Sequence, residues 1–289
     1  MMVMMISDLP PGPRRQPANL LNTAGVELWP GGLLQARANH DARLLARALR
    51  VLRRKCDGRY LAAVMSEGIT PLLPRWQEEP GIDAALDALD THPGHQRAGV
   101  DGVDTLPLHR LHERLQGLGV DAQGYARGTG LTLVAEPAWL AFAGFDRYRR
   151  ALWLHVDAAD AWQRLREAAR HDGVMLEAIS GYRSHDYQLG IFQRKLARGQ
   201  QVEQILRVNA APGYSEHHSG LALDISAPGE PPAEESFEAT PAFAWLQAKA
   251  PAHGFHMSYP RDNPHGIIYE PWHWCYAPPA AAAFIPASA

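Results

Sequence analysis

The chain has 289 residues, 46% hydrophobic and 20% charged, which is the composition of a globular protein with a substantial core. Its formal net charge of −3 lacks the basic excess of a nucleic-acid-binding protein, and no apolar run approaches the roughly 18 residues of a membrane span. Two cysteines, Cys56 and Cys275, cannot build a disulfide framework, so we expect free thiols.

The N-terminus is apolar but short. Residues Met1 to Ile6 are apolar, and Asp8 and three prolines follow at once. A secretory signal needs a basic segment and a longer apolar stretch, so the sequence displays no clear export signal. A cytoplasmic protein, a mis-assigned start codon and an unusual export route would each account for this.

Residues 1–125 are expected to form a mainly helical accessory region of unknown role. Residues 7–30 are rich in Pro, Gly and Asn, which indicates an irregular arm. Residues 33–55 carry leucine and alanine at helical spacing with arginines between them, which is typical of a surface helix. Two shorter helices are expected near 59–66 and 107–117.

The pattern changes near residue 126, and residues 126–289 are expected to form a second domain. Helical spacing, caps and stop signals predict a helix over 157–171 with Asp157 as its N-cap, a helix over 184–199 with Ser184 as its N-cap, and a helix over 241–252. Strand-like runs lie at 131–134, 174–179, 221–226, 255–259 and 267–276. Helices packed on one side of a mostly antiparallel sheet would give an α+β fold.

Two motifs in this second domain contain the residue types of a catalytic metal site. His217 and His218 precede Asp224, and Glu270 precedes His273 by three positions. Two imidazoles and one carboxylate are the protein ligands of a catalytic zinc site, which keeps a fourth position for water. Glu270 would be a spare carboxylate able to accept a proton from that water. The pattern therefore indicates a zinc hydrolase.

Each of these residues also has a structural interpretation. Asp224 lies in the apolar run from Leu221 to Ile225, where a carboxylate is costly unless it is paired with a cation or binds a metal. His273 lies between two tryptophans, where a single histidine is more often a hydrogen-bonded core residue. The presence of both motifs in one chain favours the metal site, but spacing alone does not decide between His217 and His218.

These motifs resemble those of the VanY-type D-alanyl-D-alanine carboxypeptidases, which belong to the LAS group of zinc peptidases. The resemblance covers residues 126 to 277 and rests on three motifs in the family's order. They are Ser180-Gly181-Tyr182-Arg183-Ser184 with Gln188, then Ser215-x-His217-x6-Asp224, and then Glu270-Pro271-Trp272-His273. The family implies an antiparallel sheet with helices on one side, forming a zinc carboxypeptidase domain over 126–289.

The resemblance also implies a role for each matching residue. His217, Asp224 and His273 match the three ligands of Zn²⁺, which selects His217 over His218. Glu270 matches the catalytic base, and Arg183 matches the arginine that engages the substrate near the scissile bond. Four further residues match positions that line the substrate cleft: Tyr182, Ser184, Gln188 and Ser215.

The implied activity is the zinc-dependent removal of the C-terminal D-Ala from peptidoglycan stem peptides. The alternatives are an L,D-carboxypeptidase or a D,D-dipeptidase acting on cell-wall peptides, or a non-catalytic peptidoglycan-binding module. A nucleic-acid binder that uses the arginines of residues 43–54 is disfavoured by the negative net charge. The family works in the cell envelope, so the periplasm is the expected location despite the lack of a visible signal, and no oligomeric state is predicted.

Overall fold

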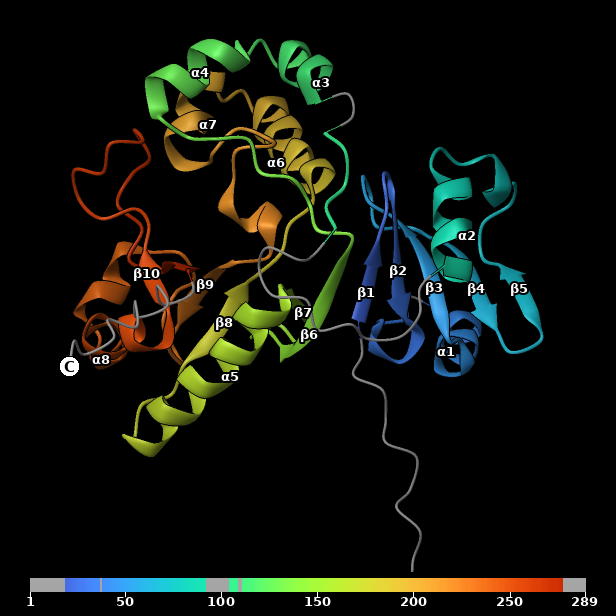
Figure 1. Ribbon diagram of the computed structural model, residues 1–289, viewed down its shortest axis with the longest axis horizontal. Coiled ribbons are helices and arrows are strands. Elements are labelled where there is room, and N and C mark those ends of the chain that lie inside the picture. The colour runs from blue at the N-terminus through green and yellow to red at the C-terminus, as the bar shows by residue number, and fades with distance from the viewer. Residues whose placement is uncertain (1–18, 37, 92–103, 109–110, 278–289) are drawn as a thin grey trace, which may run out of the picture.

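The computed structural model describes residues 19–36, 38–91, 104–108 and 111–277 (Figure 1). The apolar N-terminus and the first part of the expected arm, residues 7–18, lie outside these ranges. Among the helices of the described residues, none is long and apolar enough to cross a membrane. The thiols of Cys56 and Cys275 are both free.

The first of two sheets has seven antiparallel strands in the order β5-β4-β3-β2-β1-β6-β7. Val26, Leu28 and Leu52 are fully buried in it, against the side chains of Trp76 and Ile82. The strands are β1 (Asn19–Asn22), β2 (Val26–Pro30), β3 (Arg50–Arg54), β4 (Tyr60–Met65), β5 (Gly68–Pro71), β6 (Trp139–Phe145) and β7 (Ala151–Leu154).

The expectation of a mainly helical N-terminal region is wrong. The helix expected over 33–55 is instead α1 (Asn39–Arg47) followed by β3, and the helix expected near 59–66 is β4. Val51 and Leu52 are both fully buried and pair with β2 and β4. Pairing with neighbouring strands therefore outweighs the helical spacing of the leucines.

The rest of this region contains both expected and unexpected elements. The expected arm is irregular only in part, because β1 and β2 lie within it. The helix α2 (Ile82–Thr91) packs against β2. The helix expected near 107–117 is present as α3 (Leu111–Gly117).

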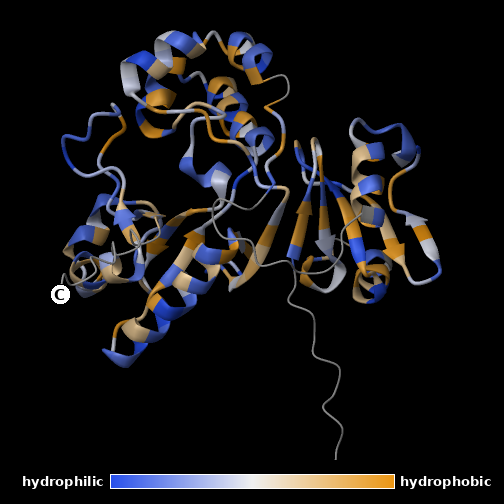
Figure 2. Cartoon of the chain, in the orientation of Figure 1, coloured by the Kyte–Doolittle hydropathy of each residue, from blue (hydrophilic) through white to orange (hydrophobic). Residues whose placement is uncertain are grey.

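The second sheet has four antiparallel strands in the order β10-β11-β9-β8. The helices α5 (Val156–His171) and α8 (Pro241–Lys249) share one core with it, and this arrangement confirms the predicted α+β fold. Figure 2 shows hydrophobic residues along the strands of both sheets and hydrophilic residues on the outer turns of the helices. The strands are β8 (Glu177–Ser180), β9 (Ala222–Ser226), β10 (Phe255–Met257) and β11 (His273–Tyr276).

Two local expectations for this part are wrong. The N-cap of α5 is His155, whose imidazole accepts a hydrogen bond from the backbone N–H of Asp157, and not Asp157 itself. Residues 131–134 form no strand, and the N–H of Val134 donates to the carbonyl of Gly213 in a loop. A short β-branched run without a partner strand beside it does not form a sheet.

A helical layer lies above the two sheets in Figure 1. It contains α3, α4 (Ala122–Thr129), α6 (His185–Ala197) and α7 (Val202–Val208), packed around Phe192 and Ile205. The predicted N-cap of α6 is confirmed, because the Ser184 hydroxyl accepts a hydrogen bond from the N–H of Tyr187.

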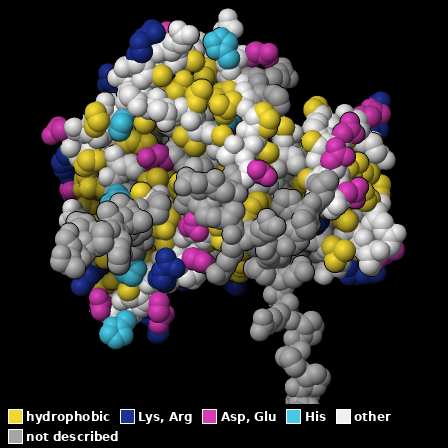
Figure 3. All heavy atoms as spheres, viewed as in Figure 1, with side chains coloured by type: hydrophobic (Ala, Val, Ile, Leu, Met, Phe, Trp, Pro, Cys, Tyr) yellow, Lys and Arg dark blue, Asp and Glu magenta, His cyan; other side chains and the backbone are white. Residues whose placement is uncertain are grey.

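The first sheet runs across the expected boundary between residues 125 and 126. Strand β1 pairs with β6, with Leu20 opposite Leu140, and β6 pairs in turn with β7. Helix α5 contacts both β6 and β7. Strands β1–β5 are therefore joined directly to the part of the chain that carries the three motifs singled out in the sequence. Figure 3 shows acidic and basic side chains interspersed over one face of the molecule.

Candidate metal centre

The pairing of β9 and β11 brings two of the predicted ligands together. In this antiparallel pair, His273 lies directly opposite Asp224. His217 lies in the 3-10 turn Glu216–Ser219, which leads into β9. One possible ligand atom from each of the three side chains lies within 4.8 Å of the others, and all three residues are buried.

The turn that carries His217 depends on Gly220. Gly220 has a φ of 72°, and a Cβ atom there would lie 2.6 Å from Leu140 Cδ2 and 2.8 Å from the backbone nitrogen of His155. Glycine accommodates both the left-handed conformation and the close approach. The 3-10 turn can therefore pack tightly against the end of β7 and direct His217 toward β9.

The geometry of the three side chains fits a divalent cation. Nε2 of His217 lies 3.3 Å and Nδ1 of His273 lies 3.2 Å from Oδ1 of Asp224. Nδ1 of His217 is 2.7 Å from the carbonyl oxygen of Gly181, while its Nε2 is buried without a hydrogen-bond partner. A buried, unpartnered ring nitrogen beside a carboxylate is a suitable donor for a metal such as zinc.

The neighbouring His218 lies outside this cluster. Its Nδ1 is 2.6 Å from the carbonyl oxygen of Arg183, and its Nε2 accepts a hydrogen bond from the N–H of Gly213. Both ring nitrogens are therefore occupied by the backbone, which leaves neither for a metal. The geometry thus agrees with the choice of His217.

The electrostatics of the cluster also suit a cation. Burial and the nearby Arg183 guanidinium lower the pKa of His217 to about 4, so its ring is in the neutral form that binds metals. Although burial opposes ionisation, interactions with His217 and His273 hold the pKa of Asp224 well below its usual range. Burial disfavours charge on His273, yet hydrogen bonds with Asp224 and Glu216 raise its pKa to about 10. Positive charge is therefore stabilised between these carboxylates.

Glu216 is a contributor that the sequence interpretation missed. Its Oε2 lies 2.8 Å from Nε2 of His273, on the opposite side of the ring from Asp224. A metal-binding histidine commonly donates its second ring N–H to a carboxylate, which fixes the ring orientation. The position beside His217 in the motif was the available signal for this role.

Glu270 lies at the edge of the cluster. Its Oε2 is 3.8 Å from Nδ1 of His273, and the residue is only 8% exposed. Burial raises the pKa of Glu270 to about 7, with Asp224 and Glu216 adding to the effect. A carboxyl group with a pKa near neutrality is suited to accept and release a proton.

Arg183 contacts the cluster at Asp224. Its Nη2 is 3.5 Å from Oδ2 of Asp224, and its side chain is 18% exposed. Its Nε is buried without a hydrogen-bond partner. The guanidinium therefore has donor capacity left for an anion next to the three ligand-type side chains.

The four expected cleft residues make contacts within the protein. The Tyr182 hydroxyl donates to Glu136, Ser184 caps α6, and the Gln188 amide donates to the carbonyl of Ala210. Ser215 is buried at the start of the 3-10 turn. The described contacts of Tyr182, Ser184 and Gln188 are those of residues that hold the site in shape.

The chain is similar to known carboxypeptidases over the part that contains the cluster. Residues 151–279 match the VanY family model, described as D-alanyl-D-alanine carboxypeptidase. YodJ of Bacillus subtilis, which is named as a carboxypeptidase, is 36% identical over 146 residues, 49% of this chain and 52% of that protein. A D-alanyl-D-alanine carboxypeptidase of Enterococcus faecalis is 35% identical over 133 residues, 43% of this chain and 48% of that protein. The chain thus spans about half the length of these relatives.

One similar solved structure is a mutant of the vancomycin-resistance D,D-pentapeptidase VanY in complex with Zn(II). It is 32% identical and the match covers 43% of this chain and 73% of that one, with a TM-score of 0.37.

Proposed function

We propose that the chain, whose residues 151–279 match the VanY family model, is a zinc-dependent D-alanyl-D-alanine carboxypeptidase acting on peptidoglycan stem peptides. One observation carries this proposal. The buried cluster of His217, Asp224 and His273 has the Glu270 carboxyl beside His273 and the Arg183 guanidinium beside Asp224. This arrangement supplies a metal site, a proton acceptor and an anion-binding group within one small volume.

His217, Asp224 and His273 would hold the zinc ion, and Glu216 would keep the His273 ring oriented. Zinc, when bound, supplies Lewis-acid chemistry that polarises the scissile carbonyl and acidifies water. Two nitrogens and one carboxylate oxygen are donors that zinc prefers. These three ligands would leave a further coordination position open to substrate.

Glu270 would act first as the general base and then as the general acid of the reaction. Its carboxylate accepts a proton from the attacking water, whose oxygen forms a bond to the carbonyl carbon. The peptide C–N bond then breaks, and the same proton passes from Glu270 to the amine nitrogen of the departing residue. Burial of Glu270 keeps its proton affinity high enough for both transfers.

Arg183 would bind the negative charge of the substrate. Its planar guanidinium suits either the oxyanion that develops at the scissile carbonyl or the free carboxylate of the terminal residue. The second contact would restrict cleavage to the end of a peptide. The unpartnered Nε of Arg183 supports either role.

Purified muropeptides test the proposal directly. The zinc-loaded protein is incubated with pentapeptide and tetrapeptide stems, with and without a chelator, and the products are weighed by mass spectrometry. Loss of one terminal Ala from the pentapeptide, abolished by the chelator, is the expected result. Cleavage of the tetrapeptide alone would identify an L,D-carboxypeptidase. Hydrolysis of free D-Ala-D-Ala to two alanines in a parallel incubation, without cleavage of either stem, would identify a D,D-dipeptidase. Binding without cleavage would identify a non-catalytic module.

We also propose that the protein works in the cell envelope, because the proposed substrate is part of the cell wall. Fractionation of cells that express the natural gene, followed by immunodetection, is expected to find the protein in the envelope fraction. Detection in the cytoplasm alone would contradict this location while leaving the enzymatic test unaffected.

A further inference from the structure

We infer that strands β1–β5 of the first sheet, called the N-terminal sheet below, are part of the proposed carboxypeptidase site, because a buried Lys55–Glu136 ion pair positions the segment that carries Arg183. The inference rests on the proposed function. It adds two positioning residues that lie outside the family match at residues 151–279, and it gives the N-terminal strands a role in the chemistry.

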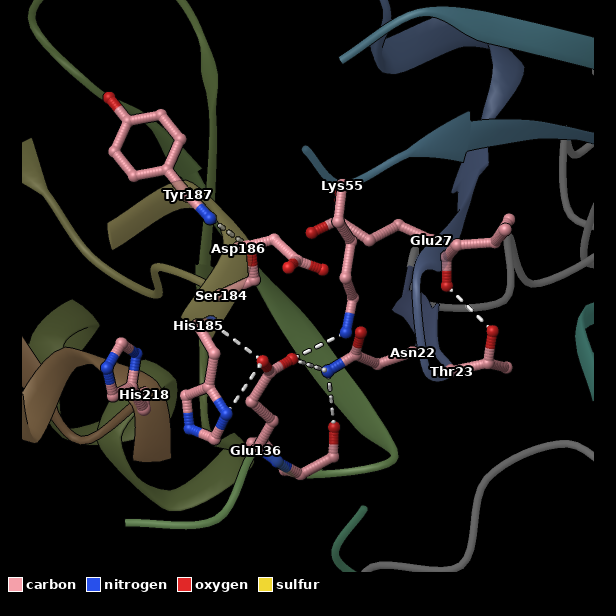
Figure 4. A network of polar contacts seen from close by, with 12 residues as sticks. Asn22, Thr23, Glu27, Lys55, Glu136, Ser184, His185, Asp186, Tyr187 and His218 are labelled. Carbon is pink, nitrogen blue, oxygen red and sulfur yellow. Dashed lines mark hydrogen bonds and ion pairs between the residues drawn. The ribbon is translucent and has the colours of Figure 1, made fainter. Parts of the chain in front are cut away.

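The ion pair links the end of β3 with the segment that precedes β6. Lys55 follows β3 and Glu136 precedes β6, and Figure 4 shows their side chains meeting beside Asn22 and His185. Nζ of Lys55 is 2.5 Å from Oε2 of Glu136, and the two side chains are 2% and 6% exposed. Two charges so deeply buried need each other, because either one alone would be strongly disfavoured.

Glu136 is ionised in this environment. Although burial opposes ionisation, the charge of Lys55 and the hydrogen bonds from Lys55 and Tyr182 hold the pKa of Glu136 well below its usual range. A charged carboxylate accepts hydrogen bonds that are stronger than those to a neutral group. Its remaining contacts therefore fix the groups that donate to it.

Those donors flank Arg183 in the sequence. Oε1 of Glu136 accepts a 2.7 Å hydrogen bond from the backbone N–H of His185, and Oε2 accepts a 2.6 Å hydrogen bond from the Tyr182 hydroxyl. One carboxylate thus holds the chain on both sides of Arg183. Asn22 of β1 supports the same arrangement, since its amide donates to the Tyr182 hydroxyl at 2.9 Å.

The backbone of Arg183 connects this network with the metal ligands. Its N–H donates to the carbonyl of His217 at 3.2 Å, and its own carbonyl lies 2.6 Å from Nδ1 of His218. The His218 ring packs edge-on against His185, with ring centroids 4.4 Å apart. A shift of residues 182–185 would therefore move the Arg183 guanidinium relative to Asp224.

The N-terminal sheet also forms part of the space beside Arg183. A cavity of about 170 Å³ is lined by Trp29 and Arg53 from β2 and β3 and by Arg183 and Tyr187 from the other part of the chain. The strands thus contribute both a buried support behind Arg183 and a wall next to it. Such a contribution is specific to the position of Arg183 and differs from general stabilisation.

The test compares variants of the full-length, zinc-loaded protein. Tyr182→Phe removes only a hydroxyl, Lys55→Met removes the cation, and the double variant Lys55→Met/Glu136→Gln removes both charges. Each is expected to keep stoichiometric zinc and to lower kcat/KM on a D-Ala-terminated peptide about 10- to 100-fold, the effect of a misplaced catalytic group. Arg54→Met is the matched control, because Arg54, the last residue of β3, forms its ion pairs within the described residues with Asp57 and Glu79 and not with Glu136.

Hydrogen–deuterium exchange gives a second measurement that does not depend on activity. Peptides covering residues 181–186 are expected to exchange faster in Tyr182→Phe and in the double variant, while those of β9 and α5 remain unchanged. The Arg54→Met control should change neither this exchange nor kcat/KM, even if its Tm falls. The double variant also guards against misfolding, because it leaves no buried charge unpaired.

The possible failures are distinguishable. If the wild-type protein hydrolyses none of the peptides, the proposed function fails, and the exchange of residues 181–186 alone decides whether the network positions this segment. If the wild type is active, values of kcat/KM within about twofold of wild type in both Tyr182→Phe and the double variant would overturn the inference. Unchanged exchange in both variants of an inactive protein would also overturn it.

Discussion

The surroundings of Glu270 favour a carboxyl group that exchanges a proton near neutral pH. Burial raises its pKa to about 7, and its Oε2 lies 3.8 Å from a ring nitrogen of His273. We expect Glu270→Gln, which keeps the shape but cannot accept the proton, to lower kcat at least about 100-fold. Zinc content, measured by mass spectrometry of the metal, should stay stoichiometric. Hydrolysis near the wild-type rate would remove Glu270 from the role of base.

Substitutions of the two adjacent histidines are expected to have opposite effects on zinc binding. His217 has a buried, unpartnered Nε2 facing Asp224, whereas both ring nitrogens of His218 are bonded to the backbone. His217→Ala should therefore lose stoichiometric zinc, and His218→Ala should retain zinc while its Tm falls. Metal analysis after dialysis and a thermal melt measure these outcomes. Zinc retained in His217→Ala and lost in His218→Ala would reverse the ligand assignment.

Glu216 orients a ligand without binding the metal in this interpretation. Oε2 of its carboxylate lies within hydrogen-bonding distance of Nε2 of His273, at 2.8 Å. Because this contact orients the ring, Glu216→Gln should weaken zinc affinity about 10- to 100-fold. Competition with a chromogenic chelator measures the affinity. Glu167→Gln is a suitable control, because Glu167 pairs with Arg170 on the exposed face of α5. Equal affinities in the two variants would show that Glu216 does not support the ligand.

At the level of the elements, the turn before β9 places His217 in the cluster. Gly220 has a φ of 72° and little room for a Cβ atom, whereas Gly229 has a φ of 86° with open space around it. Both alanine substitutions should carry the cost of a left-handed backbone, but Gly220→Ala should also push the turn away from β7. We expect Gly220→Ala to lower the free energy of unfolding by about 1–3 kcal/mol and to weaken zinc affinity.

Gly229→Ala serves as the control for the backbone term alone. Denaturant unfolding and a zinc titration of both variants separate the two effects. If both substitutions cost the same and neither changes zinc affinity, the close approach at Gly220 is not what positions His217.

The elements that carry the site were predictable from the sequence, because their signals are local. Ser184 caps α6, and the apolar run ending at Ser226 forms β9. The strands of the N-terminal sheet were not predictable in this way. Val51 and Leu52 follow leucines at helical spacing, and a short buried apolar run has no periodicity that distinguishes a strand from a helix. Pairing with β2 and β4 decided the outcome.

In the candidate site, too, local motifs were predictable from the sequence and long-range contacts were not. His217, Asp224, Glu270 and His273 lie in two short motifs, so residue types and spacing suggested a metal site there, and the family resemblance selected His217 over His218. The Lys55–Glu136 contact joins residues 81 positions apart, and neither residue belongs to a motif. Long-range contacts of this kind follow from how the sheets pack, which the spacing of residues along one chain does not encode.

At the scale of the whole molecule, the Lys55–Glu136 pair connects the N-terminal sheet with the site through a charged contact in the interior. Such a contact makes the stability of the molecule depend on pH. Because Lys55 and Tyr182 hold the pKa of Glu136 below its usual range, the folded protein binds this proton less readily than the unfolded chain does. The stabilisation is therefore complete above the unfolded carboxyl pKa of about 4.3 and is lost as the pH falls below it.

We accordingly expect the free energy of unfolding to decrease as the pH is lowered from about 4.3. Glu136 should contribute up to about 1.4 kcal/mol per pH unit to this decrease. Urea unfolding of the chelator-treated protein between neutral and acidic pH measures this slope without the separate effect of metal loss. The double variant Lys55→Met/Glu136→Gln has no carboxyl group to titrate at this position, so its slope should be shallower. Identical slopes would mean that Glu136 has similar proton affinities in the folded and unfolded states. The contact would then not stabilise the junction through its charge, and the hydrogen bonds of Tyr182 and Asn22 would have to hold the segment at residues 182–185 without it.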